Sequence, residues 1–432
     1  MTPRGPRGDR PRNARGAPIV LGLVALGLVL RLAFALLYWQ QQPLTHDERE
    51  YLALGRSVAR GDGFSYPADE PTPGTGQRFG RAPGYALFLA ALHATDPVDH
   101  APRRVQIAQA FAGAAGVWLI AAIAGLAAGS RSAVIAAAIA AVYPPLVVMP
   151  AYVFTETLFS TLALAAALLL QGGDSSVFPR NGVAVPFLAG ILTAAAALTR
   201  PVMLFFLPLW TIRQIANRAY LHAAIFLVTV AFCIIPWTIR NHQVYGRWIA
   251  IASEGGVTFW TGNHPLARGE GDLAANPDLK RAELAFRAAH PGLTPAQLEP
   301  LYYHDALTWI RAHPGAAIAL VARKAFYTIV PAGPSYALHS TRYRIASAAP
   351  YLLLLPVAAA GAWRWRTASR AGAGGASPAP LWLMAAATVL AGLIFFPQER
   401  FRLPVIDPAL IVTASLMTIT LKHERTGRHA DV

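Results

Sequence analysis

The stretch PIVLGLVALGLVLRLAFALLYW, residues 18–39, is one apolar run, and the polar stretch QQQPLTHDEREY, residues 40–51, follows it directly. A helix that crosses a bilayer needs about 20 consecutive apolar residues, which this run supplies. The run contains Arg31 and has no small-residue cleavage site near its end, so we expect an uncleaved first span and not a signal peptide. The acidic residues Asp47 and Glu48 are therefore predicted to lie at the lipid–water boundary.

The composition of the whole chain points to a membrane protein. Its 432 residues are 55% hydrophobic and only 14% charged, whereas a soluble domain carries about 25% charged residues. The net charge of +15 does not indicate nucleic acid binding, because the Arg residues sit mainly in loops and tails, where they fit anionic lipid. The single Cys233 lies in an apolar run, which excludes an intramolecular disulfide framework and a cysteine metal site.

Apolar runs of spanning length recur along the chain, and they predict an all-α polytopic bundle of about ten transmembrane helices with external loop helices. The pair around Arg200 and Pro201 is short for two crossings and predicts a tilted or broken hairpin. The expected spans are 17–39, 102–128, 131–150, 152–171, 183–199, 201–214, 220–239, 347–363, 380–397 and 403–421.

Basic residues in the short loops orient these spans, because loops rich in Arg and Lys stay in the cytoplasm. With ten spans, all such loops and both termini fall on the cytoplasmic side, while residues 40–101, 240–346 and 398–402 fall outside. High usage of Ala, Arg and Gly is typical of GC-rich bacterial DNA, so we expect the plasma (inner) membrane of a bacterium. The expected domains are a disordered basic tail over 1–16, a membrane domain over 17–421 and a cytoplasmic tail over 422–432.

The external segments are predicted to contain short helices. Residues 47–60 and 85–93 have apolar residues at helical spacing, and a loop rich in Pro and Gly separates them at 67–80. Residues 316–330 are apolar enough to suggest a span, but Arg323 and Lys324 lie near the middle. Central basic residues cost about 2.5–3.5 kcal/mol each on insertion, so this segment is predicted to lie in the external interface.

Several short motifs occur in order at the outer ends of the predicted spans. Together they resemble the GT-C glycosyltransferases that use polyprenyl-phosphate sugars, in particular the group of protein O-mannosyltransferases and lipid A aminoarabinose transferases. The resemblance runs through most of the chain, and each motif by itself is weakly specific. The motifs are DERxY at 47–51, RAPGY at 81–85, TETL at 155–158, LTRP at 198–201, PWTIRN at 236–241, WTGNHP at 260–265 and ERFRLP at 399–404.

The resemblance implies catalytic roles for two carboxylates. Sugar transfer with inversion needs a base that takes the proton of the acceptor hydroxyl, and the family's first-loop aspartate corresponds to Asp47. Glu156 is implied to share the active site, while Glu48 and Tyr51 are expected beside the substrate. The same residues also permit a structural interpretation, in which Asp47 caps the helix that begins there and Glu156 is an acid at a helix start.

Four external arginines are candidates for holding the leaving phosphate, since a guanidinium offers a fork of donors to phosphate oxygens. The alternative is that each Arg side chain reaches towards lipid head groups. These candidates are Arg81, Arg200, Arg400 and Arg402.

The second external segment adds possible substrate contacts. Glu254 precedes two glycines that allow close backbone approach, Asn263 lies in a turn, and Trp260 offers a flat face for a sugar or a prenyl chain. An ordinary turn is the alternative for this loop. The histidines form no metal-binding motif, so no metal ligand is assigned, and the resemblance leaves a divalent cation open.

The sequence thus predicts an inverting glycosyltransferase that moves a sugar from a polyprenyl-phosphate donor to an acceptor hydroxyl at the outer membrane face. The expected partners are the lipid-linked sugar, the bilayer and an acceptor lipid, glycan or protein, with no nucleic acid. A secondary transporter or lipid flippase is the rival class, but the chain shows no repeat, and its carboxylates gather at one face. A catalytically inactive scaffold is a third interpretation, which the intact acidic pair disfavours.

Overall fold

The computed structural model describes residues 16–66, 80–94, 99–173, 182–372 and 374–419. Within these ranges the chain is helical, and its one β feature is an isolated antiparallel bridge between Pro43 and His100. The predictions for both terminal tails and most of the loop at 67–80 lie outside the described residues, apart from Gly16, which begins the first helix.

The ten expected spans all correspond to apolar helical segments. Among the described residues, five helices are long and apolar enough to cross a membrane, or six if a pair bent by 62° counts as one span, and four shorter apolar segments occupy the remaining positions. The six are α1 (Gly16–Ala33) with the π-helical η2 (Phe34–Tyr38), α4 (Arg103–Ala128), bent α5 (Ser130–Val142) with α6 (Pro144–Val148) and η3 (Met149–Ala151), α7 (Glu156–Gly173), α10 (Tyr220–Tyr245) and α15 (Thr341–Arg370). The four are α8 (Ala184–Thr199), η4 (Pro201–Phe205) with α9 (Phe206–Ala216), α16 (Ala379–Ile394), and α18 (Ile406–Ser415) with η6 (Leu416–Thr418).

The bend between α5 and α6 is caused by a proline, and an arginine from α1 stabilises it. Pro144 disfavours helical backbone at Tyr143, so α5 ends there and its last carbonyl groups lose their helical partners. The buried Arg31 of α1 donates hydrogen bonds to two of these carbonyls, Ala140 at 3.3 Å and Ala141 at 3.4 Å. A cation at a helix C-terminus is favourable, which explains this Arg inside the first span.

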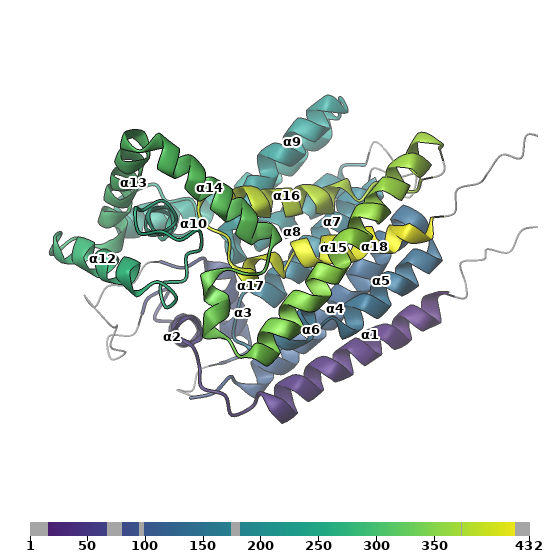
Figure 1. Ribbon diagram of the computed structural model, residues 1–432, viewed down its shortest axis with the longest axis horizontal. Helices are drawn as coiled ribbons and strands as arrows, with labels where there is room; N and C mark the ends of the chain where they lie inside the picture. Colours follow the sequence, from purple (N-terminus) through teal and green to yellow (C-terminus); the bar gives the residue numbers. More distant parts are fainter. Residues whose placement is uncertain (1–15, 67–79, 95–98, 174–181, 373, 420–432) are drawn as a thin grey trace, which may run out of the picture.

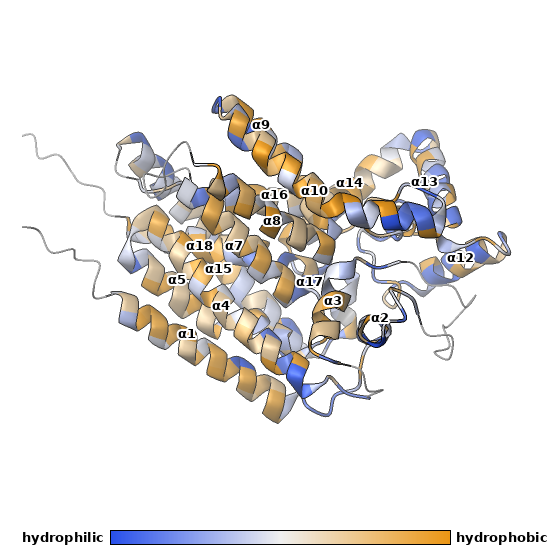
Figure 2. Cartoon of the chain, turned by 180° about the vertical axis from the view of Figure 1, so that it is seen from behind, coloured by the Kyte–Doolittle hydropathy of each residue, from blue (hydrophilic) through white to orange (hydrophobic). Residues whose placement is uncertain are grey.

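The bundle has two distinct ends (Figure 1). The start of α1 and the ends of α15 and α18 lie at one end, and the polar helices of the loops lie at the other. Figure 2 shows apolar residues along the bundle helices and hydrophilic residues concentrated in α12 and α13. The loop helices are α2 (His46–Arg60), α3 (Pro83–Ala91), α11 (Gly255–Gly262), α12 (Pro277–Ala288), α13 (Pro295–Ala312), α14 (Pro314–Ile329), η5 (Pro334–Leu338) and α17 (Glu399–Arg402).

Helix α14 covers the segment whose central basic residues argued against a span. Its 16 residues extend about 24 Å, less than the apolar thickness of a bilayer. Ile318 and Phe326 are exposed on one face, whereas Lys324 is fully buried and donates to Asn263 Oδ1 at 2.9 Å. Lys324 also bonds the Leu393 and Ile394 carbonyls at the end of α16, so this cation is satisfied by protein.

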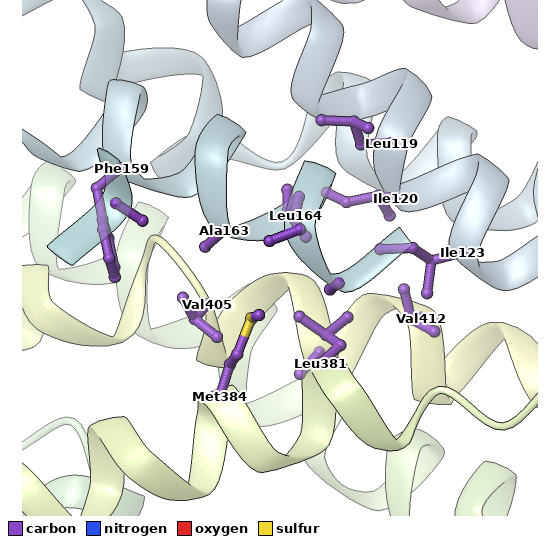
Figure 3. Close-up of a cluster of buried hydrophobic side chains, with 14 of the residues drawn as sticks. Leu119, Ile120, Ile123, Phe159, Ala163, Leu164, Leu381, Met384, Val405 and Val412 are labelled. Carbon is purple, nitrogen blue, oxygen red and sulfur yellow. The ribbon is translucent and has the colours of Figure 1, made fainter. Parts of the chain in front are cut away.

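The main core lies where α4, α7, α16 and α18 meet (Figure 3). Many buried positions in this core are Ala, and small side chains let membrane helices approach closely. The core packs these helices together, and the site residues described below lie at the ends of bundle helices or in the segments that connect them. The larger side chains of the core include Leu119, Ile120, Ile123, Phe159, Leu164, Leu381, Met384, Val405 and Val412.

Candidate active site

Helix α2 is held at its first turn by Thr45 and Glu48. The Thr45 hydroxyl accepts from the Glu48 backbone N–H at 3.4 Å, and Glu48 Oε2 accepts from the Thr45 N–H at 2.8 Å, which is a capping box. Glu48 Oε1 also accepts the Val153 N–H at 2.9 Å, tying α2 to the segment before α7. Gly61 ends the helix in the left-handed conformation, which glycine adopts without strain. Glu48, and not Asp47, is therefore the side chain that supports the helix start.

Asp47 faces two arginines that come from distant parts of the chain. Its Oδ1 lies 3.0 Å from an Arg81 nitrogen and its Oδ2 lies 2.7 Å from an Arg400 nitrogen. Arg81 also pairs with Glu50 on the next turn of α2 and with Glu254 at 3.3 Å, and its guanidinium lies over the Tyr51 ring. One guanidinium is thus shared by three carboxylates.

Glu156 at the start of α7 joins the same group of charges. Its Oε1 lies 2.7 Å from Arg200 Nη1 and 4.0 Å from Arg400 Nε, and the side chain is buried. Arg200 also donates to the Thr155 hydroxyl at 2.7 Å, and Phe401 packs against both guanidinium groups. We refer to the whole set as the acid–arginine cluster. It consists of Asp47, Glu50, Glu156 and Glu254 with Arg81, Arg200 and Arg400.

The carboxylates of the cluster are expected to differ in their affinity for protons. Although burial disfavours charge on Asp47, the guanidinium groups of Arg81 and Arg400 hold its pKa well below the usual range. Burial raises the pKa of Glu254, and the charges of Asp47 and Glu50 add to this rise against the opposing effect of Arg81. Asp47 is therefore ionised over the whole physiological range, and Glu254 is the member of this pair that holds a proton more readily.

A cavity of about 310 Å³ opens beside the cluster, and Arg200 and Glu254 line it. Most of its other lining side chains are apolar, Phe205, Phe395 and Phe396 among them, and the remaining charged ones are Glu270, Glu399 and Arg402. Pockets that are mostly apolar with a few convergent polar groups are typical of ligand sites. The arrangement suits a ligand with an apolar part in the cavity and an anionic part at the arginines.

Four of the predicted site residues lie outside the cluster, and one of them, Tyr51, still contacts it through the guanidinium of Arg81. The other three are bound elsewhere. Glu48 is occupied by the cap of α2, and Asn263 bonds Lys324 and the Ile394 carbonyl. Arg402 lines the cavity, but its guanidinium is buried, pairs with Asp407 at 3.3 Å and donates to Ser347. These three side chains already have protein partners that explain their positions.

The expectation that Trp260 offers a flat face to a substrate is wrong. The side chain is 2% exposed, and its indole N–H donates to Asp305 Oδ2 at 2.6 Å. Its ring packs against Phe286 and Tyr302 in the core of the external helices. Burial of the ring on its own helices leaves no face free for a sugar.

The structure also adds residues that the motifs did not single out. Glu50 lies three positions after Asp47, so both carboxylates project from one face of α2, and this spacing could have revealed the pair. Thr155 precedes Glu156 within a recognised motif, but its bond to Arg200 needed the tertiary structure. Among the described residues no group of three or more His, Cys, Asp or Glu has the geometry of a metal site, and the divalent cation stays a prediction.

Comparison with known proteins identifies the fold. No family model matches the chain, and no curated protein matches its sequence. The solved oligosaccharyltransferase AglB of Archaeoglobus fulgidus, in complex with an inhibitory peptide and a dolichol-phosphate, aligns with a TM-score of 0.54 at 12% identity over 94% of this chain. The same enzyme tethered to an acceptor peptide aligns with a TM-score of 0.53 at 14% identity over 94% of this chain. ArnT of Cupriavidus metallidurans bound to undecaprenyl phosphate aligns with a TM-score of 0.41 at 15% identity, covering 93% of this chain and 77% of that one.

The chain therefore has the GT-C fold, which confirms the fold class expected from the sequence. It spans about half the length of AglB, since the alignments cover 50% and 49% of that chain. The shared part is the helical membrane bundle with its loops, and at 12–14% identity the likeness concerns the fold.

Proposed function

We propose that this protein is an inverting glycosyltransferase that moves a sugar from a polyprenyl-phosphate donor to an acceptor hydroxyl at the outer face of a bacterial inner membrane. The observation that carries the proposal is the placement of Asp47 between Arg81 and Arg400, beside an apolar cavity that contains Arg200. This combination provides a base, fixed cations for a phosphate and room for a lipid chain. The dolichol-phosphate in the AglB complex supports a polyprenyl phosphate as the carrier.

The arginines would change partners when the donor binds. Both oxygens of Asp47 accept hydrogen bonds from arginines, which makes it a weak base. A donor phosphate competes for Arg81 and Arg400, and each guanidinium that turns to the phosphate leaves a carboxylate oxygen of Asp47 free. Binding of the donor thereby strengthens the base that the next step needs.

The transfer step follows from this geometry. Asp47 accepts the proton of the acceptor hydroxyl while that oxygen forms a bond to the anomeric carbon from the face opposite the phosphate. The bond between the anomeric carbon and the phosphate oxygen breaks, and the electron pair leaves with the lipid phosphate. Arg200 and Arg400, both held by Glu156, stabilise the charge on the departing group.

The membrane position of the site agrees with this chemistry. The polar helices that carry Asp47 and Arg400 lie at the end of the bundle opposite the first residues of α1 (Figure 1). With cytoplasmic termini, as the basic loops favour, the cluster faces the outer leaflet. The acceptor would then approach from the polar side, between the loop helices, and the prenyl chain from the apolar side.

Two experiments together test the proposal. The purified full-length protein is reconstituted in liposomes with radiolabelled undecaprenyl-phosphate sugars and envelope extracts, and we expect sugar transfer that releases undecaprenyl phosphate. In parallel, deletion of the gene and mass analysis of envelope lipids, glycans and glycoproteins should reveal one lost sugar, which plasmid-borne wild-type protein restores. An unchanged envelope, together with no turnover of any polyprenyl-phosphate sugar, would refute the proposed activity.

A further inference from the structure

The acid–arginine cluster contains more acids than bases. Four carboxylates, Asp47, Glu50, Glu156 and Glu254, face three guanidinium groups, and Arg81 alone serves three of the four. With these seven groups ionised and the neighbouring His46, 3.6 Å from Glu50, neutral, the cluster carries one uncompensated negative charge. A phosphodiester donor brings a second negative charge into the same partly buried space, which is costly unless one acid holds a proton.

Glu254 is the acid with the weakest compensation. Its distance of 3.3 Å to Arg81 is longer than that of Asp47 to the same guanidinium, which is 3.0 Å, and Glu50 lies closer still. Glu156 has its own short pair with Arg200 at 2.7 Å, whereas no second ion pair to Glu254 occurs among the described residues. Glu254 is therefore the acid of the cluster whose charge is least compensated by a guanidinium group.

Glu254 also lies where a phosphate would be bound. It lines the cavity together with Arg200, and its side chain is 32% exposed, so its carboxyl group is open to a ligand there. The cation and the carboxyl group approach the cavity from separate segments, one before η4 and one before α11. A phosphate between them would accept hydrogen bonds from Arg200 and from a protonated Glu254, but an ionised Glu254 would repel it.

We propose that Glu254 is protonated in the donor complex and donates a hydrogen bond from its carboxylic acid to the donor phosphate. This inference rests on the proposed function, because it assumes a lipid-linked phosphodiester in the cavity. Asp47 and Glu254 then have different roles in the reaction. The ionised Asp47 accepts the proton of the acceptor, and the neutral Glu254 binds the phosphate, a division typical of sites whose environments drive two carboxyl groups apart.

The surroundings of Glu254 agree with this assignment. The charged groups that act on it are Arg81 and Arg200, which favour ionisation, and Asp47 and Glu50, which oppose it. The phenols of Tyr51 and Tyr66 also lie within its electrostatic reach. Glu299 on α13 is a further neighbouring acid, and burial raises its pKa as well. Glu299 does not line the cavity among the described residues, which makes it a matched control.

The sign of the expected pH effect follows from linkage. A ligand that binds the protonated acid raises the pKa of that acid, so affinity is full at low pH and declines as pH rises above the pKa of the free site. The limiting decline for one proton is about tenfold per pH unit. The amide of the Glu254→Gln variant donates at every pH, so this variant should abolish the decline in affinity.

The test measures binding of undecaprenyl methyl phosphate, a phosphodiester with a constant single charge, to the full-length protein in nanodiscs between pH 5.5 and 9. Wild type should lose affinity progressively above the pKa of Glu254, by up to about tenfold per pH unit. Glu254→Gln should vary less than about twofold over the range, because its amide keeps the donated hydrogen bond. Glu254→Ala should bind about tenfold or more weakly at low pH, since a hydrogen bond to a charged group is lost. Glu299→Gln should keep the wild-type slope.

Two results overturn the inference. Either Glu254→Gln retains the pH dependence of wild type, or it binds as weakly as Glu254→Ala at every pH while its unfolding temperature equals that of wild type. Both leave the glycosyltransferase proposal standing, provided that wild type binds the probe. Failure of wild type to bind the phosphodiester at any pH would instead contradict the proposed function and this inference with it.

Discussion

Arg400 and Arg402 stand two positions apart on the single turn of α17, yet they belong to different regions of the molecule. Arg400 is 30% exposed and pairs with Asp47 in the acid–arginine cluster. Arg402 is 7% exposed and pairs with Asp407, whose side chain is fully buried at the start of α18. Residues two apart on a helix point in nearly opposite directions, so one turn serves both regions.

The two regions are expected to differ in role: the acid–arginine cluster binds ligand, and the buried pair of Arg402 and Asp407 stabilises the fold. Ion pairs with partial exposure contribute little to stability, so a ligand can replace either partner at small cost. The pair of Arg402 and Asp407 is buried. Arg402 donates to the hydroxyl groups of Ser347 and Tyr336, and Asp407 accepts from the hydroxyl group of Tyr143. Removing one member of such a pair leaves a buried charge without compensation. We therefore expect changes in the first region to alter activity and changes in the second to alter stability.

The largest effect is expected for Asp47→Asn. Asparagine keeps the shape of the side chain but accepts no proton, and general base catalysis contributes about 10²–10⁴-fold to rate. Sugar transfer in liposomes should fall by about that factor, with an unfolding temperature close to that of wild type. Turnover equal to wild type would remove Asp47 from the mechanism, and loss of folding would place it in the supporting region instead.

Arg402→Met should have the next effect, on stability. The change leaves Asp407 buried and unpaired, which costs about 3–5 kcal/mol. Denaturant unfolding in detergent measures this loss. The double variant with Asp407→Leu removes both charges and should recover much of the stability, because a buried pair is readily replaced by apolar residues. If the double variant is no more stable than Arg402→Met, the loss of stability does not come from leaving Asp407 without its partner.

Arg400→Met should weaken catalysis by about 10–100-fold, since it removes a charge-assisted hydrogen bond of about 1.5–3 kcal/mol. It should also change the pH profile. Arg400 is one of two guanidinium groups that lower the pKa of Asp47, so its loss raises that pKa. Protonated Asp47 accepts no proton, and activity should therefore fall at acidic pH where wild type is still active. If the acidic side of the pH–activity profile is the same as in wild type, Arg81 alone lowers the pKa of Asp47.

Thr45→Ala should have the smallest effect. It removes the hydroxyl of the capping box at the start of α2, and loss of such a cap costs about 1 kcal/mol. Unfolding in detergent should detect this change, while transfer activity changes little, because Glu48 still binds the Val153 N–H and holds the helix near α7. A loss of activity comparable with that of Arg400→Met would show that the position of Asp47 depends on the cap.

Much of the fold could be predicted from residue patterns. The apolar runs predict the ten segments. The basic residues within residues 316–330 argue against a span, and the helix found there is not among the candidate spans of the described residues, while its place in the external interface stays a prediction. Helix lengths were harder to predict, because α10 continues to Tyr245 and α15 begins at Thr341, each beyond its apolar run. Backbone hydrogen bonds propagate a helix past the apolar part wherever caps and packing allow it.

The candidate site could be predicted only in part. Asp47, Arg81, Glu156, Arg200 and Arg400 come from the motifs and meet in the cluster, and Glu254 joins them from outside the motifs. Glu48, Asn263 and Arg402 have supporting contacts instead. Neighbours in sequence, such as Asp47 and Glu48, carry the same chemical group. Which of them caps the helix and which faces an arginine depends on side-chain direction in three dimensions.

The sequence by itself determined that this chain is a helical membrane protein with acids and arginines at one side, because apolar length and charge position are local properties that the bilayer selects. Only the tertiary structure decided which charges pair. Asp47 and Arg400 are 353 positions apart, and their contact requires the fold to bring α2 and α17 together. Electrostatic pairing acts over a few ångströms, so the division between the acid–arginine cluster and the Arg402 pair is settled by how the helices pack.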